Sequence, residues 1–215
     1  MNKPLIMIGS GGHASVLMDL LQLNGCNVIA YISPDKNNNQ MFESIQYSSD
    51  DGDISQFNPD DVLLVNGLGS LPKQNNREKV AAFFSKLGFS FATVISPHAI
   101  VSSSAYLAQG VQVMSGAIIQ TGAYIGENSI INTGAIIEHD CNVGANNHIA
   151  PRATLCGNVT TQDDVHIGVH ACIIQGVDIG KNVIVGAGAT VTKNIEDKAI
   201  VYGHRALIIK RNEML

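Results

Sequence analysis

A histidine flanked by two acidic residues is the strongest candidate for chemistry in this sequence. His139 lies between Glu138 and Asp140, and Cys141 follows them. A neutral histidine beside a carboxylate is the usual arrangement of a general base, because the carboxylate fixes the ring tautomer and stabilises the imidazolium that forms. Sequence adjacency leaves open which carboxylate acts. It also leaves open that His139 is a solvated surface residue.

Two pairs of residues in this half of the chain are separated by the same interval. Gly157 follows His139 by 18 residues, and His166 follows His148 by 18. If 18 residues make one coil of a repeating fold, the members of each pair lie side by side. Gly157 then offers an unhindered backbone N–H beside the candidate base, which suits a developing oxyanion. His148 and His166 are expected to stack on an outer face.

A glycine-rich segment near the N-terminus is the second place where chemistry is expected. Gly9, Gly11 and Ala14 fit the pattern G-x-G-x-x-A between an apolar strand and a helix. Backbone N–H groups at such a helix start favour a phosphate, and His13 is a candidate donor to it. Dinucleotide binding also needs an acidic residue at the end of the second strand, where the chain has Ser33. We therefore expect another phosphorylated or nucleotide ligand rather than NAD, with a purely structural turn as the alternative.

A six-residue repeat must position the candidate base. Stepping in sixes from Ile95 to Val191 passes through 17 positions, of which 16 are Ile, Leu or Val. The positions shifted by three are never aliphatic and are mostly Gly, Asn or Asp, which tolerate the left-handed backbone angles of tight bends. Such a period marks a parallel β-helix, here of roughly five coils. Cys141 falls in an inward slot, so we expect it in the core.

A small parallel α/β sheet is expected before the repeat. The expected strands are Leu5–Ile8, Asn27–Ile32 and Asp61–Val65, with one helix after the glycine loop and another near Asn75–Leu87. Residues 33–60 are polar and are expected to be mostly loop. Ligands of such sheets bind at the carboxyl ends of the strands.

The chain is accordingly divided into three parts. Residues 1–94 form a Rossmann-like domain, residues 95–192 a left-handed β-helix, and residues 193–215 a C-terminal cap. An open β-helix end must be covered, and the tail after Val191 is expected to do this. A contact of the tail with a cofactor is the further possibility.

Composition excludes several classes of protein. The formal net charge is −5 and no run of Lys or Arg is present, so nucleic acid is not an expected partner. No apolar segment has the length of a membrane-spanning helix, which is about 18 residues or more. The N-terminus shows no signal-peptide pattern, so we expect a cytoplasmic protein whose four cysteines are reduced.

A metal site is an alternative use of the histidines. The expected architecture resembles that of the γ-class carbonic anhydrases, whose catalytic zinc needs three protein ligands and an open position. The spacing of His148, His166 and His170 does not match that family. We therefore expect no metal. A nucleophilic role for Cys156 is a further alternative that the spacing does not favour.

The residues taken together resemble a known enzyme family. The hexads followed by Val185–Asn194 are similar to the hexapeptide-repeat acyltransferases. The N-terminal Gly11-Gly12-His13 segment and the stretch from Ile130 through Cys141 narrow the resemblance to the sugar O-/N-acetyltransferases of the NeuD and PglD type. One departure is the absence of the family's proline in Gly203–Ala206, which leaves the role of Arg205 open.

The resemblance implies an acetyl-CoA-dependent enzyme that works as a homotrimer, with active sites between subunits. His139 would be the general base and Asp140 would orient it. The resemblance assigns the acetyl-CoA contacts to His148, Gly157, Gly168 and Gly186. It assigns the acceptor contacts to Gly11, Gly12, His13, Asp35, Gly67 and Asn132, and it makes the N-terminal domain a nucleotide-sugar-binding domain.

The expected reaction is acetylation of the 4-amino group of a UDP-linked amino-dideoxy sugar in glycan precursor synthesis, by direct attack through a tetrahedral intermediate. One alternative is O-acetylation of sialic acid or another sugar. Another is a non-catalytic trimer that binds a nucleotide sugar.

Overall fold

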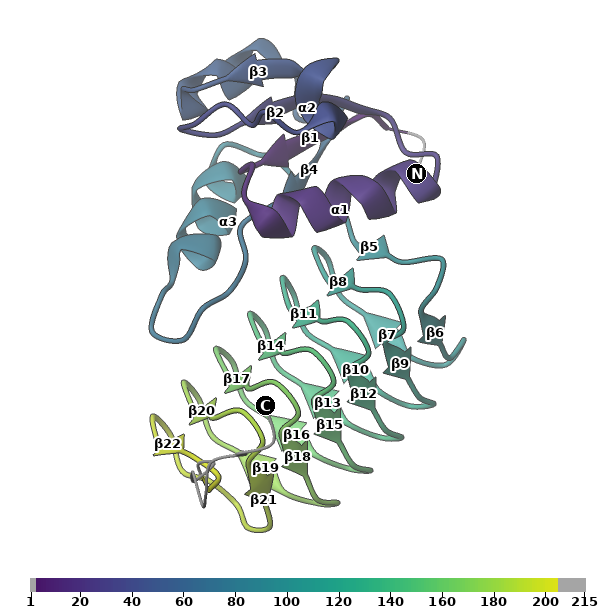
Figure 1. Cartoon of the computed structure of the whole chain (residues 1–215), viewed down its shortest axis with the longest axis vertical. Helices are drawn as coiled ribbons and strands as arrows, with labels where there is room; N and C mark the ends of the chain where they lie inside the picture. The colour runs from purple at the N-terminus through teal and green to yellow at the C-terminus, as the bar shows by residue number, and fades with distance from the viewer. Residues whose placement is uncertain (1–2, 205–215) are drawn as a thin grey trace, which may run out of the picture.

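The chain forms two parts, an N-terminal α/β domain and a long β-helix on whose first coils that domain lies (Figure 1). The computed structural model describes residues 3–204. The predicted fold class, a Rossmann-like domain followed by a left-handed parallel β-helix, is confirmed. Residues 205–215 lie outside the described part, and with them the expected role of Arg205 and the second half of the expected cap.

The N-terminal domain is built on a parallel sheet of order β3-β2-β1-β4. Its strands are β1 (Leu5–Ile8), β2 (Val28–Ile32), β3 (Gln46–Ser48) and β4 (Leu63–Asn66), and its helices are α1 (Gly12–Leu23), α2 (Gln40–Glu43), the 3-10 helix η1 (Asp51–Gln56) and α3 (Asn76–Lys86). Strand β1 is buried throughout, as expected for the centre of a parallel sheet. The predicted strands and helices of this domain are confirmed to within a few residues.

Residues 33–60 are mostly loop, as expected, but three short elements that the sequence did not predict also lie there. Asn39 accepts a hydrogen bond from the Met41 N–H and so begins α2. Asp50 accepts one from the Gly52 N–H and begins η1. Between them β3 pairs with β2 along the sheet edge. With β3 the sheet has four strands, and the carboxyl ends of all four lie along one edge of the domain.

The β-helix, called the prism below, consists of two-residue strands on three faces. The seven-stranded face contains β5 (Val94–Ile95), β8 (Gln112–Val113), β11 (Ile130–Ile131), β14 (His148–Ile149), β17 (His166–Ile167), β20 (Ile184–Val185) and β22 (Ile200–Val201). The six-stranded face contains β6 (Ile100–Val101), β9 (Ile118–Ile119), β12 (Ile136–Ile137), β15 (Thr154–Leu155), β18 (Cys172–Ile173) and β21 (Thr190–Val191). The five-stranded face contains β7 (Tyr106–Leu107), β10 (Tyr124–Ile125), β13 (Asn142–Val143), β16 (Thr160–Thr161) and β19 (Asp178–Ile179).

The sequence repeat predicts the coils correctly. Strands pair in parallel with the strand 18 residues further on, for example Ile137 with Leu155. Apart from Ile95, which is exposed, the hexad aliphatics form one continuous core, and Cys141 lies in it as predicted. Most bend positions have positive φ, including non-glycine residues such as Asp140 and Asn158. The small polar residues of the shifted row therefore stand where the left-handed conformation is required.

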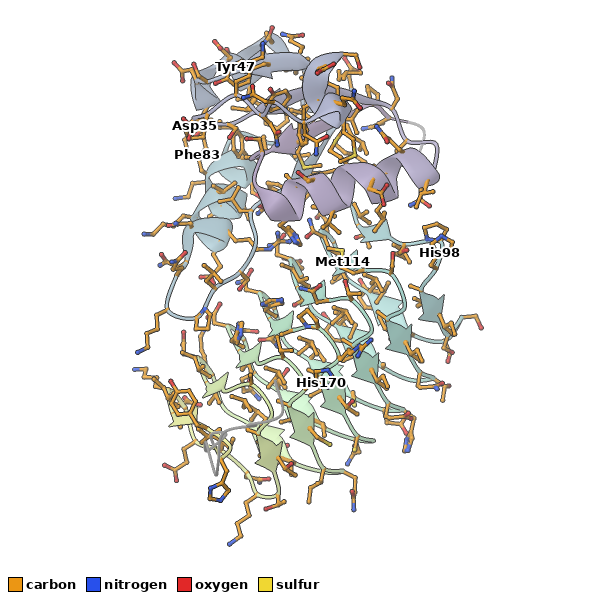
Figure 2. All side chains as sticks on the ribbon, viewed as in Figure 1. Asp35, Tyr47, Phe83, His98, Met114 and His170 are labelled. Atoms are coloured by element: carbon orange, nitrogen blue, oxygen red, sulfur yellow. The ribbon has the colours of Figure 1, made fainter. Side chains whose placement is uncertain are left out.

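The N-terminal domain packs on the start of the seven-stranded face. Met114 and Ile130 of the prism belong to the same core cluster as α1 and β1, and Figure 2 shows Met114 between the two parts. The chain crosses from one part to the other after Phe91, which bridges to Leu64 of β4, and then Val94 pairs with Gln112. The glycine loops are thus held at a fixed place on the prism. No helix within residues 3–204 is long and apolar enough to cross a membrane.

Candidate functional site

His139 lies at the bend between the six-stranded and five-stranded faces, where its side chain is 57% exposed. Its Nδ1 is 2.9 Å from Oδ2 of Asp140. Asp140 has a left-handed backbone conformation, with φ of 59°, and its carboxylate contacts the imidazole ring of the preceding residue, His139. Of the two carboxylates that the sequence left open, Asp140 is therefore the one that contacts His139. A donating Nδ1–H leaves Nε2 free to accept a proton.

Gly157 lies directly against the ring of His139, as the 18-residue interval predicts. A Cβ atom at position 157 would be 2.5 Å from Nε2 of His139, so only glycine leaves the ring in place. No backbone carbonyl in the described range accepts the Gly157 N–H. An unpaired N–H on a residue in contact with an imidazole ring is compatible with an oxyanion donor beside a general base, the pair that acyl transfer uses.

His148 and Asn132 form a second pair, on the seven-stranded face. The side-chain amide of Asn132 is oriented by the Thr133 N–H, which donates to Oδ1 over 2.7 Å. Its Nδ2 therefore faces Nε2 of His148, 3.0 Å away, and donates to it. A neutral His148 then carries its proton on Nδ1, which is buried near the Ser70 backbone but makes no hydrogen bond of normal geometry within the described residues.

The rings of His148 and His166 stack as predicted, edge to face with centroids 4.9 Å apart. His148 is only 8% exposed because the N-terminal domain covers it. Burial, followed by the repulsion that a protonated His148 would meet from His166, His13 and Arg77, lowers the pKa of His148 to about 3. Burial also lowers the pKa of His166. Both rings are neutral at pH 7, and the Nδ1 of His166 is likewise buried and unpartnered in the described part of the chain.

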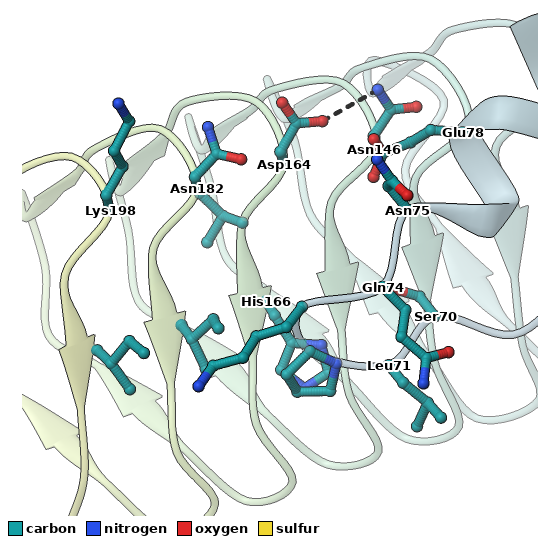
Figure 3. A pocket seen from close by; sticks show the side chains of 15 residues that line it. Ser70, Leu71, Gln74, Asn75, Glu78, Asn146, Asp164, His166, Asn182 and Lys198 are labelled. Carbon is teal, nitrogen blue, oxygen red and sulfur yellow. Dashed lines mark hydrogen bonds between the residues drawn. The ribbon is translucent and has the colours of Figure 1, made fainter.

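A cavity of about 430 Å³, called the prism cavity, lies between the segment 70–75 and the seven-stranded face (Figure 3). His166 and Ile184 line its apolar side. Asn75 and Glu78 line the side that faces the N-terminal domain, and the bend residues Asn146, Asp164, Asn182 and Lys198 line the rim. An elongated molecule with polar and apolar parts fits this lining.

A larger cavity of about 930 Å³, called the sheet-end cavity, lies at the carboxyl ends of the four N-terminal strands. Gly11, Gly12, His13 and Gly67, for which the resemblance implies acceptor contacts, line it. Gly11 and Gly12 have open space on the side where a Cβ would be, and no side chain caps the start of α1. Backbone N–H groups at this helix start are therefore available to an anion.

The acidic residues of the sheet-end cavity differ from the sequence-based expectation. Asp50 and Asp51, which follow β3, line the cavity. Asp35 does not, and Figure 2 shows it on the outer part of the domain, away from the prism. The sequence reading missed Asp50 and Asp51 because it did not predict β3, whose carboxyl end presents them.

The two cavities adjoin. Leu71 and Gln74 line both of them, so the segment 70–75 separates the strand ends from the prism only partly. His139, in contrast, lies at the bend between the other two faces of the prism. One chain therefore brings together the sheet-end cavity, the prism cavity and His148, but it does not bring His139 to them.

Several glycines expected at the site have packing roles. A Cβ at Gly168 would be 2.6 Å from the Ala187 backbone nitrogen of the next coil. A Cβ at Gly186 would collide with the ring of Tyr202. A Cβ at Gly67 would be 2.8 Å from the Ile8 carbonyl oxygen. These positions need glycine for close approach, whatever ligand lies near them.

The cysteines near the site are poor nucleophiles. Burial raises the pKa of the Cys141 thiol to about 11, and burial, followed by Cys172, raises that of Cys156. All four cysteines are free. Among residues 3–204 no three His, Cys, Asp or Glu side chains are grouped to hold a metal ion.

Sequence reading missed a buried polar network between the two parts. It includes Gln112 of β8, Asn66 of β4 and Arg77 of α3, all nearly inaccessible to solvent. Gln112 interrupts an otherwise apolar outward row at the start of the prism. The polar Gln112 was the signal for this network in the sequence, but it is buried only because the N-terminal domain packs over it.

Known protein families match three stretches of the chain. The PglD N-terminal domain family matches residues 4–82. The bacterial transferase hexapeptide family, of six repeats, matches residues 122–157, and the hexapeptide repeat of succinyl-transferase matches residues 162–193. No curated protein sequence matches the chain.

Solved structures resemble almost the whole chain. PerB from Caulobacter crescentus, in complex with CoA and GDP-perosamine, is 32% identical with a TM-score of 0.83, over 94% of this chain and 95% of that chain. A histidine-to-asparagine mutant of perosamine N-acetyltransferase from the same organism, also with CoA and GDP-perosamine, is 31% identical with a TM-score of 0.84 over the same shares. The acetyltransferase domain of PglB from Neisseria gonorrhoeae, in complex with acetyl coenzyme A, is 28% identical with a TM-score of 0.84, over 94% and 97%.

Proposed function

The chain belongs to the PglD-like family of hexapeptide-repeat sugar acetyltransferases, and we propose that it acetylates the 4-amino group of a UDP-linked amino-dideoxy sugar. It is an acetyl-CoA-dependent acetyltransferase, as the sequence indicates, and acetyl-CoA is its cosubstrate. The solved relative with CoA and GDP-perosamine makes a GDP-linked amino sugar the second candidate acceptor.

The observation that carries this proposal is the continuity of the two cavities. A nucleotide sugar needs an anion site for its diphosphate, and the open start of α1 offers one. The nucleobase then lies over the carboxyl ends of β2 and β3, near Asp51, because the opposite edge of the sheet, at β4, leads to the prism. The sugar lies past Leu71 and Gln74, which both cavities share. The amine is thereby carried toward the prism cavity.

The prism cavity suits the acetyl end of acetyl-CoA. His166 lines its apolar side, and the buried Nδ1 atoms of His166 and of the adjacent His148 have no hydrogen-bond partner in the described chain. A thioester or amide carbonyl that accepts from such a donor would satisfy it, because buried donors cost free energy when they are left unpaired. Asn132 holds His148 in the tautomer that presents this N–H.

The chemistry follows from the His139 site. The amine nitrogen attacks the thioester carbonyl carbon while Nε2 of His139 accepts a proton from that nitrogen. Asp140 stabilises the imidazolium through Nδ1. The Gly157 N–H stabilises the oxyanion of the tetrahedral intermediate. The intermediate then expels the CoA thiolate, and the imidazolium returns its proton to the sulfur.

Because His139 and the cavities belong to different faces of one prism, we place the reaction between subunits of a homotrimer. His139 and Gly157 of one subunit face the His148 and cavities of the next. A trimer of prisms repeats this interface three times, which fits the closed symmetry usual for homo-oligomers.

A thiol-release assay with acetyl-CoA tests the proposal. The acceptors are UDP- and GDP-linked 4-amino sugars, their 4-hydroxy counterparts and free sialic acid. We expect release with a nucleotide-linked amine and none with the matched hydroxyl sugar. Release only with sialic acid would show an O-acetyltransferase instead. No release with any acceptor would favour a non-catalytic nucleotide-sugar-binding protein.

A further inference from the structure

Gln112 is a polar side chain between the apolar Val94 and Ile130 in the outward row of the seven-stranded face, and it is only 1% exposed. It projects outward from β8, and the N-terminal domain covers it. Both ends of its amide are used. Nε2 donates to the backbone carbonyl of Asn66 over 2.9 Å, and Oε1 is 2.8 Å from Nε2 of His13. A residue of the prism therefore contacts a residue of the sheet-end cavity.

These contacts fix the orientation of the Gln112 amide. A backbone carbonyl only accepts hydrogen bonds, so the nitrogen end of the amide must face Asn66. The oxygen end then faces His13, and it also only accepts. His13 must therefore donate from Nε2–H, which places its proton on that nitrogen.

The remaining nitrogen of His13, Nδ1, is an acceptor on a side chain that lines the sheet-end cavity. Burial, together with the charge of Arg77, lowers the pKa of His13 to about 4, so the ring is neutral at pH 7. Nδ1 then carries a lone pair and no proton. It has no hydrogen-bond partner among the described residues, and it is not fully buried. His13 itself lines the sheet-end cavity.

We propose that Gln112 is a positioning residue for the acceptor, which holds His13 as the neutral Nε2–H tautomer so that Nδ1 accepts a hydrogen bond from an N–H or O–H group of the bound sugar nucleotide. This rests on the proposed function, because it places the acceptor in the sheet-end cavity. It assigns His13 to a donor group of the sugar or ribose and not to the diphosphate, since a neutral acceptor nitrogen does not bind a phosphate oxygen.

The surroundings of Gln112 keep its partner carbonyl in place. Arg77 Nη1 donates to the same Asn66 carbonyl over 2.9 Å, and Asn66 Nδ2 donates back to the Arg77 carbonyl. Arg77 Nε reaches the Asn128 carbonyl at a bend of the prism. The charged and titratable groups near His13 are Arg77 and His148. The tautomer is thus set by a network that also fixes the N-terminal domain on the prism.

The first test is the tautomer itself. Nitrogen-15 NMR of the full-length protein distinguishes a protonated Nε2 from a protonated Nδ1, and loss of the signal in His13→Gln assigns it. We expect the neutral Nε2–H form at pH 7 in the wild type, and a mixture of tautomers in Gln112→Leu. A protonated Nδ1 in the wild type would overturn the proposal. This readout needs no substrate, so it decides the inference even if the wild type releases no thiol with any acceptor and the proposed function fails.

The second test is a kinetic double-mutant cycle of Gln112→Leu and His13→Ala. We expect Gln112→Leu to raise the acceptor KM about tenfold, because the loss of one net hydrogen bond corresponds to about 1.4 kcal/mol. The kcat and the KM for acetyl-CoA should change by no more than about twofold. The double variant should be little worse than His13→Ala alone, because Gln112 acts through His13. Additive effects, or an unchanged acceptor KM, would show that Gln112 is only structural.

Two further variants keep the test decisive. Gln112→Met has similar length and replaces Gln112→Leu if the latter fails to fold. Ile130→Val removes packing from the same outward row one coil on, where Ile130 is also covered by the N-terminal domain. It should lower stability slightly and leave the acceptor KM unchanged.

Discussion

At the scale of single residues, the chemistry depends on the contact between the His139 ring and Gly157. A side chain at position 157 would have to displace the ring, because its Cβ would be 2.5 Å from Nε2. Gly157→Ala should therefore lower kcat by about 100-fold or more through loss of the base and of the oxyanion donor geometry. Steady-state kinetics with unfolding curves checks this, and the neighbouring Cys156→Ala is the control that should retain activity. Wild-type kcat in Gly157→Ala would contradict the site.

Asp140 and Glu138 allow a matched comparison of two adjacent carboxylates. Only Asp140 contacts His139, so Asp140→Asn should lower kcat by ten- to about a hundredfold because the imidazolium loses its partner. Asparagine tolerates the φ of 59° at this bend, so the fold should be kept. Glu138→Gln should change kcat little. Equal losses in both variants would show that the orientation of His139 does not come from Asp140.

The sequence could identify His139 and Gly157 because their relation is set by the repeat. It could not choose between Glu138 and Asp140, since that depends on the backbone conformation of one bend. It could not foresee that His148 is covered, or that Gln112 fixes His13. Both depend on how a separate domain packs on the prism, which no local pattern records.

At the scale of elements, the covering of the seven-stranded face by the N-terminal domain leads to a pH dependence of stability. The folded pKa values of His13 and His148 are lowered to about 4 and about 3 from an ordinary value of 6.5. Between these values the unfolded chain binds more protons than the folded chain, so stability should fall as pH drops below about 6.5 and continue to fall toward pH 4.

Urea unfolding between pH 7.5 and 4.5 measures this loss. His148→Gln removes one of the buried rings and should make the pH dependence shallower. His170→Asn is the control, because His170 lies at an exposed bend with φ of 56° where asparagine is tolerated. A slope identical in wild type and His148→Gln would show that His148 titrates normally in the folded protein.

The predictability of the elements differed between the two parts. The prism follows from its period, because 16 of 17 hexad positions are aliphatic and one phase is kept throughout. The edge strand β3 and the short helices α2 and η1 were missed. Strand β3 has three residues and α2 has four, so neither is long enough to display a period. The helices α2 and η1 begin at side-chain caps, Asn39 and Asp50.

At the scale of the whole molecule, His139 lies away from the cavities of its own subunit, so the proposed reaction requires a second subunit. Mixed oligomers test this. His139→Ala removes the base, and Gly12→Leu fills the sheet-end cavity from a position with open space beside it. Each variant alone should be inactive. Co-refolded in equal amounts, they should regain about a quarter of wild-type activity, the share of interfaces that unite two intact halves. No recovery, with mixed oligomers shown to form, would place the whole site within one chain.

The most direct measurement compares the wild type with His139→Asn, using acetyl-CoA and a UDP-linked 4-amino-dideoxy sugar, with the GDP-linked sugar in parallel. Thiol release is followed over time, and the sugar product is identified by NMR. We expect stoichiometric thiol release and an acetamide at the 4-position with the wild type, and turnover lower by about 100-fold or more with His139→Asn at unchanged acetyl-CoA binding. Equal turnover by the two proteins, or acetylation of a hydroxyl group in place of the amine, would contradict the proposed function.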